Sequence, residues 1–442
     1  PHDFGLIGMV TVVIAFASMF KDAGLSMATV HKSHITPDQV SALFWVNLLV
    51  SLFLGFTLIA SASFIAMFYG RPELTVITQV LALSLIIQGV TTQHDALLRR
   101  HMRFLALAVA NILASITALV VAIILALSGW SYWALVGSTI TSSTMIFFLT
   151  LFFCPWVPGK LQRRPRIRSM LRFGGHVTGF NFFNYITRHA DDILIGKFIG
   201  ADALGLYAQA YTIVQLPIQT LRNPITQVAI PACSRLQASH DNLRSYARKY
   251  TFLLAFFGMP LMLFAFVFSK ELILVLLGEQ WLPMDHLFRI FALVGFIQTP
   301  ANVKGMLLLS LGKSKEYLYQ GLAVSLITLL SFAIGLYWGL IGVAASYAIS
   351  VYLIQLPTLY YASKYTPLHI SDFFVSIYRP AIASIVSGVL VIVFSSHFLI
   401  YNPGVNLLVM IPVFFAAYLA VFVMIPKGLL IIQTDLVAAL RK

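Results

Sequence analysis

Hydrophobic residues along the chain form long runs separated by short polar stretches, and the runs lack the alternation of a half-buried strand. A helix needs roughly 20 residues to cross about 30 Å of hydrocarbon, and backbone groups in lipid must bond within their own segment. The pattern therefore predicts thirteen membrane-spanning α-helices, because a β-barrel would show alternating segments of about ten residues. The predicted spans are residues 4–30, 41–69, 74–98, 104–128, 133–153, 171–198, 202–232, 246–268, 287–311, 317–336, 339–360, 375–399 and 405–425.

Basic residues gather in every second loop between these spans. Twenty Lys and Arg lie in one set of loops, which includes Lys32 and the run Lys160–Arg172, against only Arg71 and Lys270 in the other set. Cytoplasmic loops collect Lys and Arg, so this asymmetry predicts that the first set and the C-terminus are cytoplasmic. Pro1 then lies outside, and we expect one further helix upstream, which would complete a plan of fourteen spans.

Composition agrees with a protein solvated by lipid. Hydrophobic residues make up 59% of the 442 residues and charged residues 10%, whereas about 25% of residues are charged in a soluble protein. A net charge of +14 would otherwise indicate a nucleic-acid partner. The bias of the loops accounts for it, so we expect no nucleic acid as a partner. Two cysteines are too few for a disulfide framework.

The chain also repeats itself loosely, at offsets near 200 residues. Asp3-Phe4-Gly5-Leu6 recurs as Asp202-Ala203-Leu204-Gly205-Leu206, Trp133–Gly137 recurs as Trp338–Gly342, and Gln88 is echoed by Gln298. Six helices per half imply parallel repeats, related by a pseudo-two-fold axis along the membrane normal. The predicted division is an N-terminal lobe lacking its first helix (1–153), a basic linker (154–170), a C-terminal lobe (171–360), and two additional helices with a cytoplasmic tail (361–442).

Polar residues mark one face of the predicted helix 171–198. Asn181, Asn184, Arg188 and Asp191 follow one another at spacings of three or four residues, with Asp192 at the edge, and such spacings place side chains on one helical face. Intramembrane charges commonly pair with one another, so the face could be a polar seam that holds helices together. Alternatively it lines a water-filled cavity, where Asp191 or Asp192 could exchange a proton or cation.

The next predicted helix, 202–232, carries a second polar stripe. The stripe consists of Thr212, Gln215, Gln219, Arg222 and Thr226. Pro217 and Pro224 interrupt its backbone bonding, and broken helices line central sites in transporters. No acidic residue lies within one turn of Arg222, so this helix favours an anionic ligand over a purely structural role.

The repeat extends this interpretation to the other half of the chain. An offset of 201 residues places Lys21 opposite Arg222, and an offset of 210 places His94 opposite Lys304. His94 could equally be a histidine that only packs between helices. Asp191 and Asp192 have no His, Cys or Glu at ligand spacing, and no phosphate-binding glycine loop appears. We therefore expect no metal site, no cofactor and no ATP-driven chemistry.

Three stretches resemble the polysaccharide flippases of the multidrug/oligosaccharidyl-lipid/polysaccharide exporter superfamily. They are Asp3-Phe4-Gly5-Leu6 through Asp22-Ala23-Gly24-Leu25, Asp191-Asp192 through Leu204-Gly205-Leu206-Tyr207, and Val228-Ala229-Ile230-Pro231-Ala232-Cys233-Ser234-Arg235-Leu236-Gln237. The last is similar to the family's Phe-Pro-Ala-x-Ser-Arg-Leu-Gln signature. The resemblance covers essentially the whole chain, apart from the first helix of the family plan.

This resemblance implies two six-helix lobes around a cavity that alternates between inward and outward states, in the cytoplasmic (inner) membrane. It implies a transporter, not an enzyme, whose substrate is an oligosaccharide repeat unit on a polyprenyl pyrophosphate, destined for O-antigen or exopolysaccharide. Besides the lipid-linked substrate and membrane lipids, a polysaccharide polymerase and glycosyltransferases are candidate partners. Two alternatives stay open, namely a multidrug/cation antiporter of the same superfamily and a membrane-embedded glycan polymerase or ligase.

The candidate substrate-binding residues are Lys21, Asn181, Asn184, Arg188, Gln215, Gln219, Arg222 and Lys304, and the candidate ion-coupling residues are Asp191 and Asp192.

Overall fold

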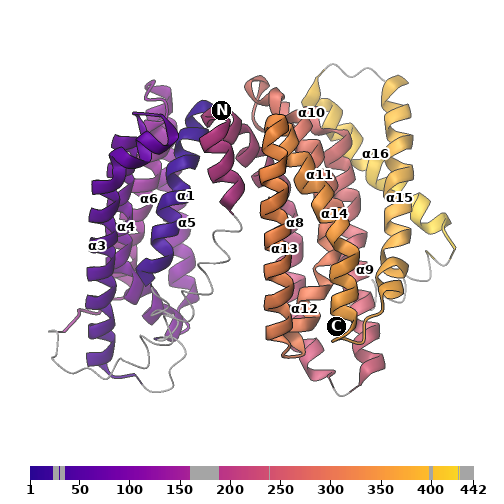
Figure 1. Cartoon of the computed structure of the whole chain (residues 1–442), viewed down its shortest axis with the longest axis horizontal. Coiled ribbons are helices and arrows are strands. Elements are labelled where there is room, and N and C mark those ends of the chain that lie inside the picture. The colour runs from indigo at the N-terminus through magenta and orange to yellow at the C-terminus, as the bar shows by residue number, and fades with distance from the viewer. Residues whose placement is uncertain are drawn as a thin grey trace. The chain divides into compact units, whose positions relative to one another are not determined.

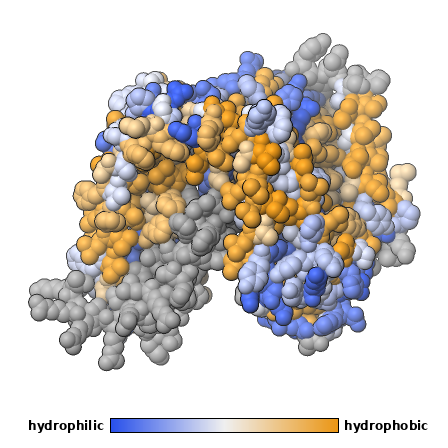
Figure 2. Space-filling model, viewed as in Figure 1, coloured by the Kyte–Doolittle hydropathy of each residue, from blue (hydrophilic) through white to orange (hydrophobic). Residues whose placement is uncertain are grey.

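The computed structural model describes residues 1–22, 29, 35–159, 189–237, 239–397, 402–426 and 428. Within this part of the chain, ten segments are helical, long and apolar enough to span a membrane. Hydrophobic residues cover the sides of the helices, and hydrophilic residues gather at their ends (Figure 2). The prediction of an all-α integral membrane protein is thereby confirmed.

The chain divides into two compact units, Pro1–Gly205 (unit 1) and Leu206–Lys442 (unit 2). Unit 1 contains α1 (His2–Asp22), α3 (Pro37–Tyr69), α4 (Leu74–Arg100), α5 (Phe104–Leu127), α6 (Trp133–Phe153) and the first turn of α8 (Ala201–Arg235). Unit 2 contains the rest of α8, α9 (His240–Val267), α10 (Ser269–Leu276), η1 (Glu279–Met284), α11 (Asp285–Ala301), α12 (Val303–Ser310), α13 (Ser314–Gly335), η2 (Leu336–Trp338), α14 (Gly339–Ser363), α15 (Ile370–His397) and α16 (Pro403–Met424). The predicted division into two lobes, a linker and two additional helices with a cytoplasmic tail stays a prediction.

Each predicted span that falls on described residues corresponds to helix. The predicted spans 104–128 and 133–153 differ from α5 and α6 by at most one residue. The predicted span 287–311 is instead interrupted at Asn302, between α11 and α12. The interruption lies two residues after Pro300, which is inside α11.

Neighbouring helices of unit 1 pack along one another (Figure 1). Helix α3 lies along α4, α5 lies along α6, and α1 contacts both α3 and α4. The start of α3 is fixed by a capping box, in which Thr36 Oγ1 accepts from the Gln39 backbone N–H while the Gln39 side chain accepts from the Thr36 N–H. Gly70 ends the helix in the left-handed region at φ 68°, which glycine adopts without steric cost.

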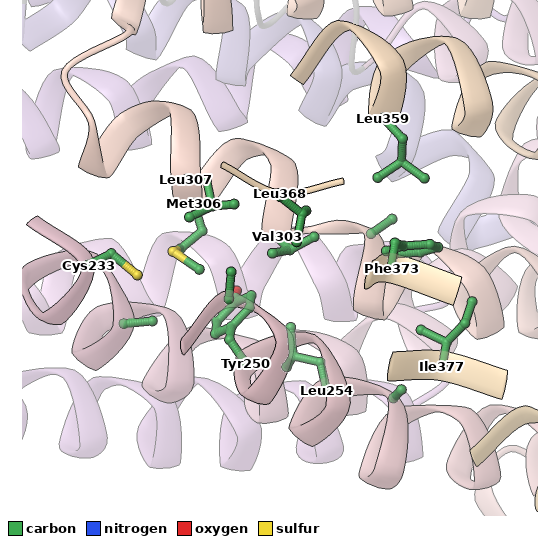
Figure 3. Close-up of a cluster of buried hydrophobic side chains, with 14 of the residues drawn as sticks. Cys233, Tyr250, Leu254, Val303, Met306, Leu307, Leu359, Leu368, Phe373 and Ile377 are labelled. Atoms are coloured by element: carbon green, nitrogen blue, oxygen red, sulfur yellow. The ribbon is translucent and has the colours of Figure 1, made fainter. Parts of the chain in front are cut away.

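Helix α9 is central to unit 2, where it packs against both α11 and α15. The cluster of buried side chains in Figure 3 joins the end of α8 to α9, α12, α14 and α15 through residues that include Cys233, Tyr250, Val303, Leu359 and Phe373. A second cluster joins α9 to α16 through aromatic residues such as Phe256 and Tyr418. Helices α15 and α16 are therefore integral to unit 2.

An ion pair ties the start of α15 to the start of α9. Arg244 Nε and Nη2 donate to the two carboxylate oxygens of Asp372 at 2.7 and 3.0 Å. Asp372 also accepts from the His369 backbone N–H at 2.9 Å, and its side chain is only 5% exposed. Because both carboxylate oxygens accept hydrogen bonds, Asp372 can stay charged where it is buried.

Candidate functional site

The polar stripe of α8 contains a cation without a partner in the described part of the chain. Arg222 is half-buried, and its guanidinium makes no hydrogen bond or ion pair with a described residue. Pro217 and Pro224 flank it on the same helix. A positive charge held in membrane-spanning protein without a counter-ion is costly, so this position suits a ligand that brings negative charge.

One turn further along α8, Thr226 belongs to a hydrogen-bonded group of three side chains. Thr226 Oγ1 lies 2.8 Å from the Tyr250 hydroxyl of α9. The Asn302 amide donates to the Tyr250 hydroxyl at 2.8 Å and to Thr226 Oγ1 at 3.3 Å. Asn302 sits at the interruption between α11 and α12, so three elements of unit 2 meet at polar atoms beside Arg222.

Lys304, at the start of α12, is held by the side of α14. Its Nζ donates to Thr358 Oγ1 at 2.7 Å and to Gln355 Oε1 at 3.0 Å. Both acceptors are neutral, and no described carboxylate forms a salt bridge with Lys304. The lysine therefore adds positive charge to unit 2, although two hydrogen bonds already fix its position.

The glutamines of the α8 stripe differ in their surroundings. Gln215 is buried and donates to Gln298 Oε1 of α11 at 3.3 Å. Gln219 is exposed on the surface of unit 2. The sequence placed Gln215 and Gln219 on one stripe, and among the described residues only Gln215 of the two has a hydrogen bond to a neighbouring helix.

In unit 1, Lys21 forms the corresponding contact between α1 and α4. Its Nζ donates to Gln88 Oε1 at 2.9 Å, and the Gln88 amide donates to Ser143 of α6 at 3.3 Å. Gln88 and Gln298 echo each other in the sequence. Gln88 bonds to Lys21 of α1 in unit 1, and Gln298 bonds to Gln215 of α8 in unit 2.

His94 packs between helices, which is the alternative the sequence had left open. It is 1% exposed, and its ring nitrogens lie 3.1 and 3.0 Å from the carbonyl oxygens of Val90 and Trp156. Its ring also meets those of Phe44 and Trp156 edge to face. We therefore assign His94 a structural role.

The two candidate coupling carboxylates lie in a helical stretch, 189–198, at the end of unit 1. Asp192 accepts from His189 Nδ1 at 3.0 Å, a pairing that the sequence analysis did not foresee. Asp191 is buried, with 8% of its surface exposed. Asn181, Asn184 and Arg188, predicted on the same face, lie outside the described residues.

The first turns of α1 and α8 touch through glycines. A Cβ added at Gly5 would lie 1.7 Å from the Ala201 carbonyl oxygen, and one added at Gly205 would lie 2.2 Å from the Pro1 carbonyl oxygen. His2 Nδ1 lies 3.2 Å from Asp202 Oδ1 beside this contact. Only glycine allows two backbones to approach so closely, so the sequence requires Gly5 and Gly205 here.

Sequence reasoning missed Tyr250, Asn302, Gln355 and Thr358, which hold or adjoin the cations of unit 2. Only Asn302 carried a signal, because it lies two residues after Pro300 inside a predicted span, and a proline inside a helix often accompanies a kink or break. The others are isolated polar residues in apolar helices, and such residues are common. Among the described residues, no group of three or more His, Cys, Asp or Glu could hold a metal ion.

Comparison with known proteins identifies the family of the chain. A family model described as polysaccharide biosynthesis protein matches residues 1–286, which is more than half of the chain. The chain belongs to this family. The polysaccharide biosynthesis protein family is the one that the sequence motifs had indicated.

Three individual relatives are each similar over more than two thirds of this chain, at low sequence identity. The teichuronic acid biosynthesis protein TuaB of Bacillus subtilis (strain 168) is 28% identical over 382 residues, which cover 85% of this chain and 78% of TuaB. The succinoglycan biosynthesis transport protein ExoT of Rhizobium meliloti (strain 1021) is 24% identical over 68% of this chain and 61% of ExoT. The lipopolysaccharide biosynthesis protein WzxC of Escherichia coli (strain K12) is 23% identical over 70% of this chain and 63% of WzxC. The match thus spans less than two thirds of ExoT and WzxC.

Solved structures show the same fold. The lipid II flippase MurJ in an inward closed conformation superposes with a TM-score of 0.78 at 15% identity, over 97% of this chain and 94% of MurJ. An inward-facing multidrug transporter of the MATE family gives a TM-score of 0.66 at 14% identity, over 83% of this chain and 90% of that transporter. The all-α transporter fold is therefore confirmed, and the arrangement in two six-helix lobes stays a prediction.

Proposed function

We propose that this protein is a flippase, which moves oligosaccharide repeat units linked to a polyprenyl pyrophosphate across the cytoplasmic membrane by alternating access. Membership of the polysaccharide biosynthesis protein family supports the polysaccharide assignment. The fold shared with MurJ supports the transport mechanism. The units moved would serve surface polysaccharide, either O-antigen or exopolysaccharide.

The observation that carries this proposal is Arg222. It is a half-buried arginine on a helix with two prolines, and its guanidinium has no hydrogen-bond or ion-pair partner in the described part of the chain. A pyrophosphate is multiply charged and must cross hydrocarbon. An arginine offers it a planar fork of donors, and the attraction between the two charges is several times stronger in a low dielectric than in water.

The remaining candidate residues would complete this site. Lys21 and Lys304 add positive charge from α1 and α12, and Arg188 would add more. Gln215, Gln219, Asn181 and Asn184 offer donors and acceptors that sugar hydroxyls can use. These side chains bind and orient a substrate without forming a covalent bond, so the proposed activity requires no catalytic group.

Coupling to an ion gradient is assigned to Asp191 and Asp192. Asp191 is buried, and a buried carboxylate in a membrane helix is a candidate group for taking up a proton or cation. Asp192 is paired with His189. Charging or neutralising this pair would change the cost of burying it in the membrane, and the energy difference could drive one half of the transport cycle.

The proposed setting is the inner membrane, with the C-terminus in the cytoplasm. The 20 to 2 distribution of basic residues between the two sets of loops supports this orientation. Glycosyltransferases would supply the substrate on the cytoplasmic side, and a polysaccharide polymerase would use it on the other side.

A multidrug/cation antiporter is the second candidate, because the MATE transporter shares the fold. A site for cationic drugs favours carboxylates. In this chain the candidate residues include three cations and two carboxylates, and this excess of positive charge favours an anionic substrate. The cations are Lys21, Arg222 and Lys304, and the carboxylates are Asp191 and Asp192. The family match favours the same choice.

Replacing Arg222 tests the proposal. A hydrogen bond to a charged group contributes about 1.5–3 kcal/mol, so Arg222→Gln should lower the rate of flipping at limiting substrate roughly 10- to 150-fold. Arg222→Lys should keep part of the activity because it keeps the charge. Arg379→Gln is the matched control, since the Arg379 guanidinium donates to the Pro426 carbonyl at the end of the last helices.

The assay follows carrier-linked repeat units in a strain that lacks its own copy of the gene. The units should accumulate on the cytoplasmic side with Arg222→Gln and should be exported with Arg379→Gln, at equal protein levels. Full export with Arg222→Gln would remove the anionic-substrate assignment. Export of cationic dyes with no effect on repeat units would establish the antiporter instead.

A further inference from the structure

Unit 1 contains an apolar cavity between α1, α3 and the helical stretch 189–198. Its volume is about 310 Å³, and its walls include Val13 and Phe16 from α1, Phe64 and Phe68 from α3, and Ile193. The side chains of Phe64 and Phe68 are 69% and 40% exposed. These two phenylalanines therefore form the open side of the cavity, where it faces the surface of the helices.

The chemistry of the walls excludes most ligands. Apart from the hydroxyl group of Tyr69, the lining side chains carry only carbon and hydrogen. A sugar or a phosphate would lose its hydrogen bonds to water here without replacement. A hydrocarbon chain has no hydrogen bonds to lose. A ligand with branched chains or aromatic rings can make close contacts with Phe16, Phe64 and Phe68.

A cation lies at the rim of the cavity. Lys197 Nζ is 4.7 Å from the centre of the Phe68 ring and donates to the Phe68 carbonyl oxygen. The lysine is exposed, so it can also meet a ligand from outside. The other titratable groups on this stretch are Asp191, which is buried, and His189 and Asp192, which are bonded to each other. The cavity and Lys197 together match an amphiphile with a hydrocarbon chain and an anionic head.

We propose that this cavity holds part of the isoprenoid chain of the polyprenyl pyrophosphate carrier, with the pyrophosphate at Lys197 at a different step of the transport cycle from the one in which it binds Arg222. The inference rests on the proposed function for the identity of the lipid. A volume of 310 Å³ is at the lower end of the range for small-molecule pockets, so it accommodates a segment next to the head and not the whole chain. The rest of the chain leaves between Phe64 and Phe68 into the bilayer.

This occupant is favoured over a phospholipid by shape and charge. Surrounding acyl chains are as apolar as the cavity, so entry gains nothing from leaving water. A ligand must therefore gain from fit, and the methyl branches of an isoprenoid fill a space between aromatic rings better than a straight chain does. Two phosphates also offer Lys197 more negative charge than a zwitterionic phospholipid offers.

Photocrosslinking in the purified full-length protein tests the proposal directly. The photoreactive residue p-benzoylphenylalanine replaces Phe64 in phosphatidylcholine nanodiscs loaded with undecaprenyl pyrophosphate. As a matched control, it replaces Phe53, which is 70% exposed on the same helix and lies away from the cavity. We expect an isoprenoid adduct at position 64 that excess carrier competes away, and only phospholipid adducts at position 53.

Two substitutions then separate the chain from the head group. Val13→Trp fills the cavity and should lower the adduct at position 64 at least tenfold, whereas Val120→Trp on the exposed side of α5 should leave it unchanged. Lys197→Gln should lower the adduct with the pyrophosphate several-fold but not that with uncharged undecaprenol. Phospholipid adducts at position 64, or an isoprenoid adduct that Val13→Trp does not reduce, would overturn the inference.

Crosslinking reports binding at equilibrium, so its failure is distinct from failure of the proposed function. If the protein flips repeat units but position 64 captures only phospholipid, the cavity assignment fails and the flippase stands. If position 64 captures the carrier but no repeat unit is flipped, the cavity assignment holds and the transport proposal fails.

Discussion

Replacing Gly5 with alanine probes the contact between the first turns of α1 and α8. The added Cβ would lie 1.7 Å from the carbonyl oxygen and 2.4 Å from the carbonyl carbon of Ala201. Both are backbone atoms, so no side chain can rotate away to make room. The two helices must move apart, and the arrangement seen in this structure becomes less stable than one in which the contact is open.

The size of the effect follows from the packing and can be separated from helix propensity. Excess volume in a packed interior costs typically about 1–3 kcal/mol, which shifts an equilibrium about 5- to 150-fold. Alanine also favours the helix over glycine by about 1 kcal/mol. Gly8→Ala has the same propensity effect, but its Cβ would lie 3.5 Å from Leu204 Cδ2, which is an ordinary contact. The difference between the two variants therefore isolates the clash at Gly5.

Chemical bridging across the same contact measures the equilibrium. His2 and Asp202, whose side chains lie 3.2 Å apart, are replaced with cysteine, and a short bifunctional methanethiosulfonate links them. Cys154 and Cys233 are buried and react slowly in comparison. We expect the bridging yield at limiting reagent to fall at least fivefold with Gly5→Ala and to stay at the parent level with Gly8→Ala. Equal yields in the two variants would refute the close approach of the helices.

Three further substitutions separate structural from functional charges. Lys304→Met should reduce flipping at least tenfold without lowering the melting temperature in detergent, because it removes a charge that is costly in a membrane helix. Asp372→Asn should lower the free energy of unfolding by about 1–3 kcal/mol, because it leaves Arg244 without its carboxylate, and the melting temperature should fall while helical circular dichroism is retained. His94→Leu should cost a similar amount through the lost bond to the Trp156 carbonyl, with flipping retained in the protein that folds.

Each of these outcomes has a clear opposite. Loss of stability with Lys304→Met would make that lysine a structural element. An unchanged melting temperature with Asp372→Asn would mean that its ion pair adds nothing, and Asp38→Asn, at an exposed carboxylate, gives the baseline. A flipping defect with His94→Leu at normal protein levels would return His94 to the list of functional residues.

The helices were predictable because lipid leaves the backbone few options. A segment of apolar residues in hydrocarbon must satisfy its own hydrogen bonds, so length and hydropathy suffice to place it. The agreement of α5 and α6 with the predicted spans reflects this. The interruption at Asn302 was missed because the run of apolar residues continues across it, and hydropathy does not register a lost hydrogen bond.

Partners of the polar side chains could not be predicted in the same way. Periodicity tells which face of a helix a residue occupies but not which helix lies opposite. Lys304 bonds to Gln355 and Thr358, which are 51 and 54 residues away, and no spacing rule connects them. Offset arithmetic placed His94 opposite Lys304, yet a slip of one residue turns a helix by about 100°, and His94 packs within its own unit.

The loose repeat in the sequence has an offset near 200 residues, and contacts between the first turns of α1 and α8 follow the same offset. Gly5 meets residue 201 and Gly205 meets residue 1, so the two contacts exchange places under an offset of 200 residues. His2 pairs with Asp202, which is its own counterpart at that offset. Reciprocal contacts of this kind are expected where two copies of a segment meet across a two-fold axis, and the predicted pseudo-two-fold relation of the two halves stays a prediction. The small residue needed for close approach must then occur in both copies, which explains why a glycine recurs in two segments that otherwise share little sequence.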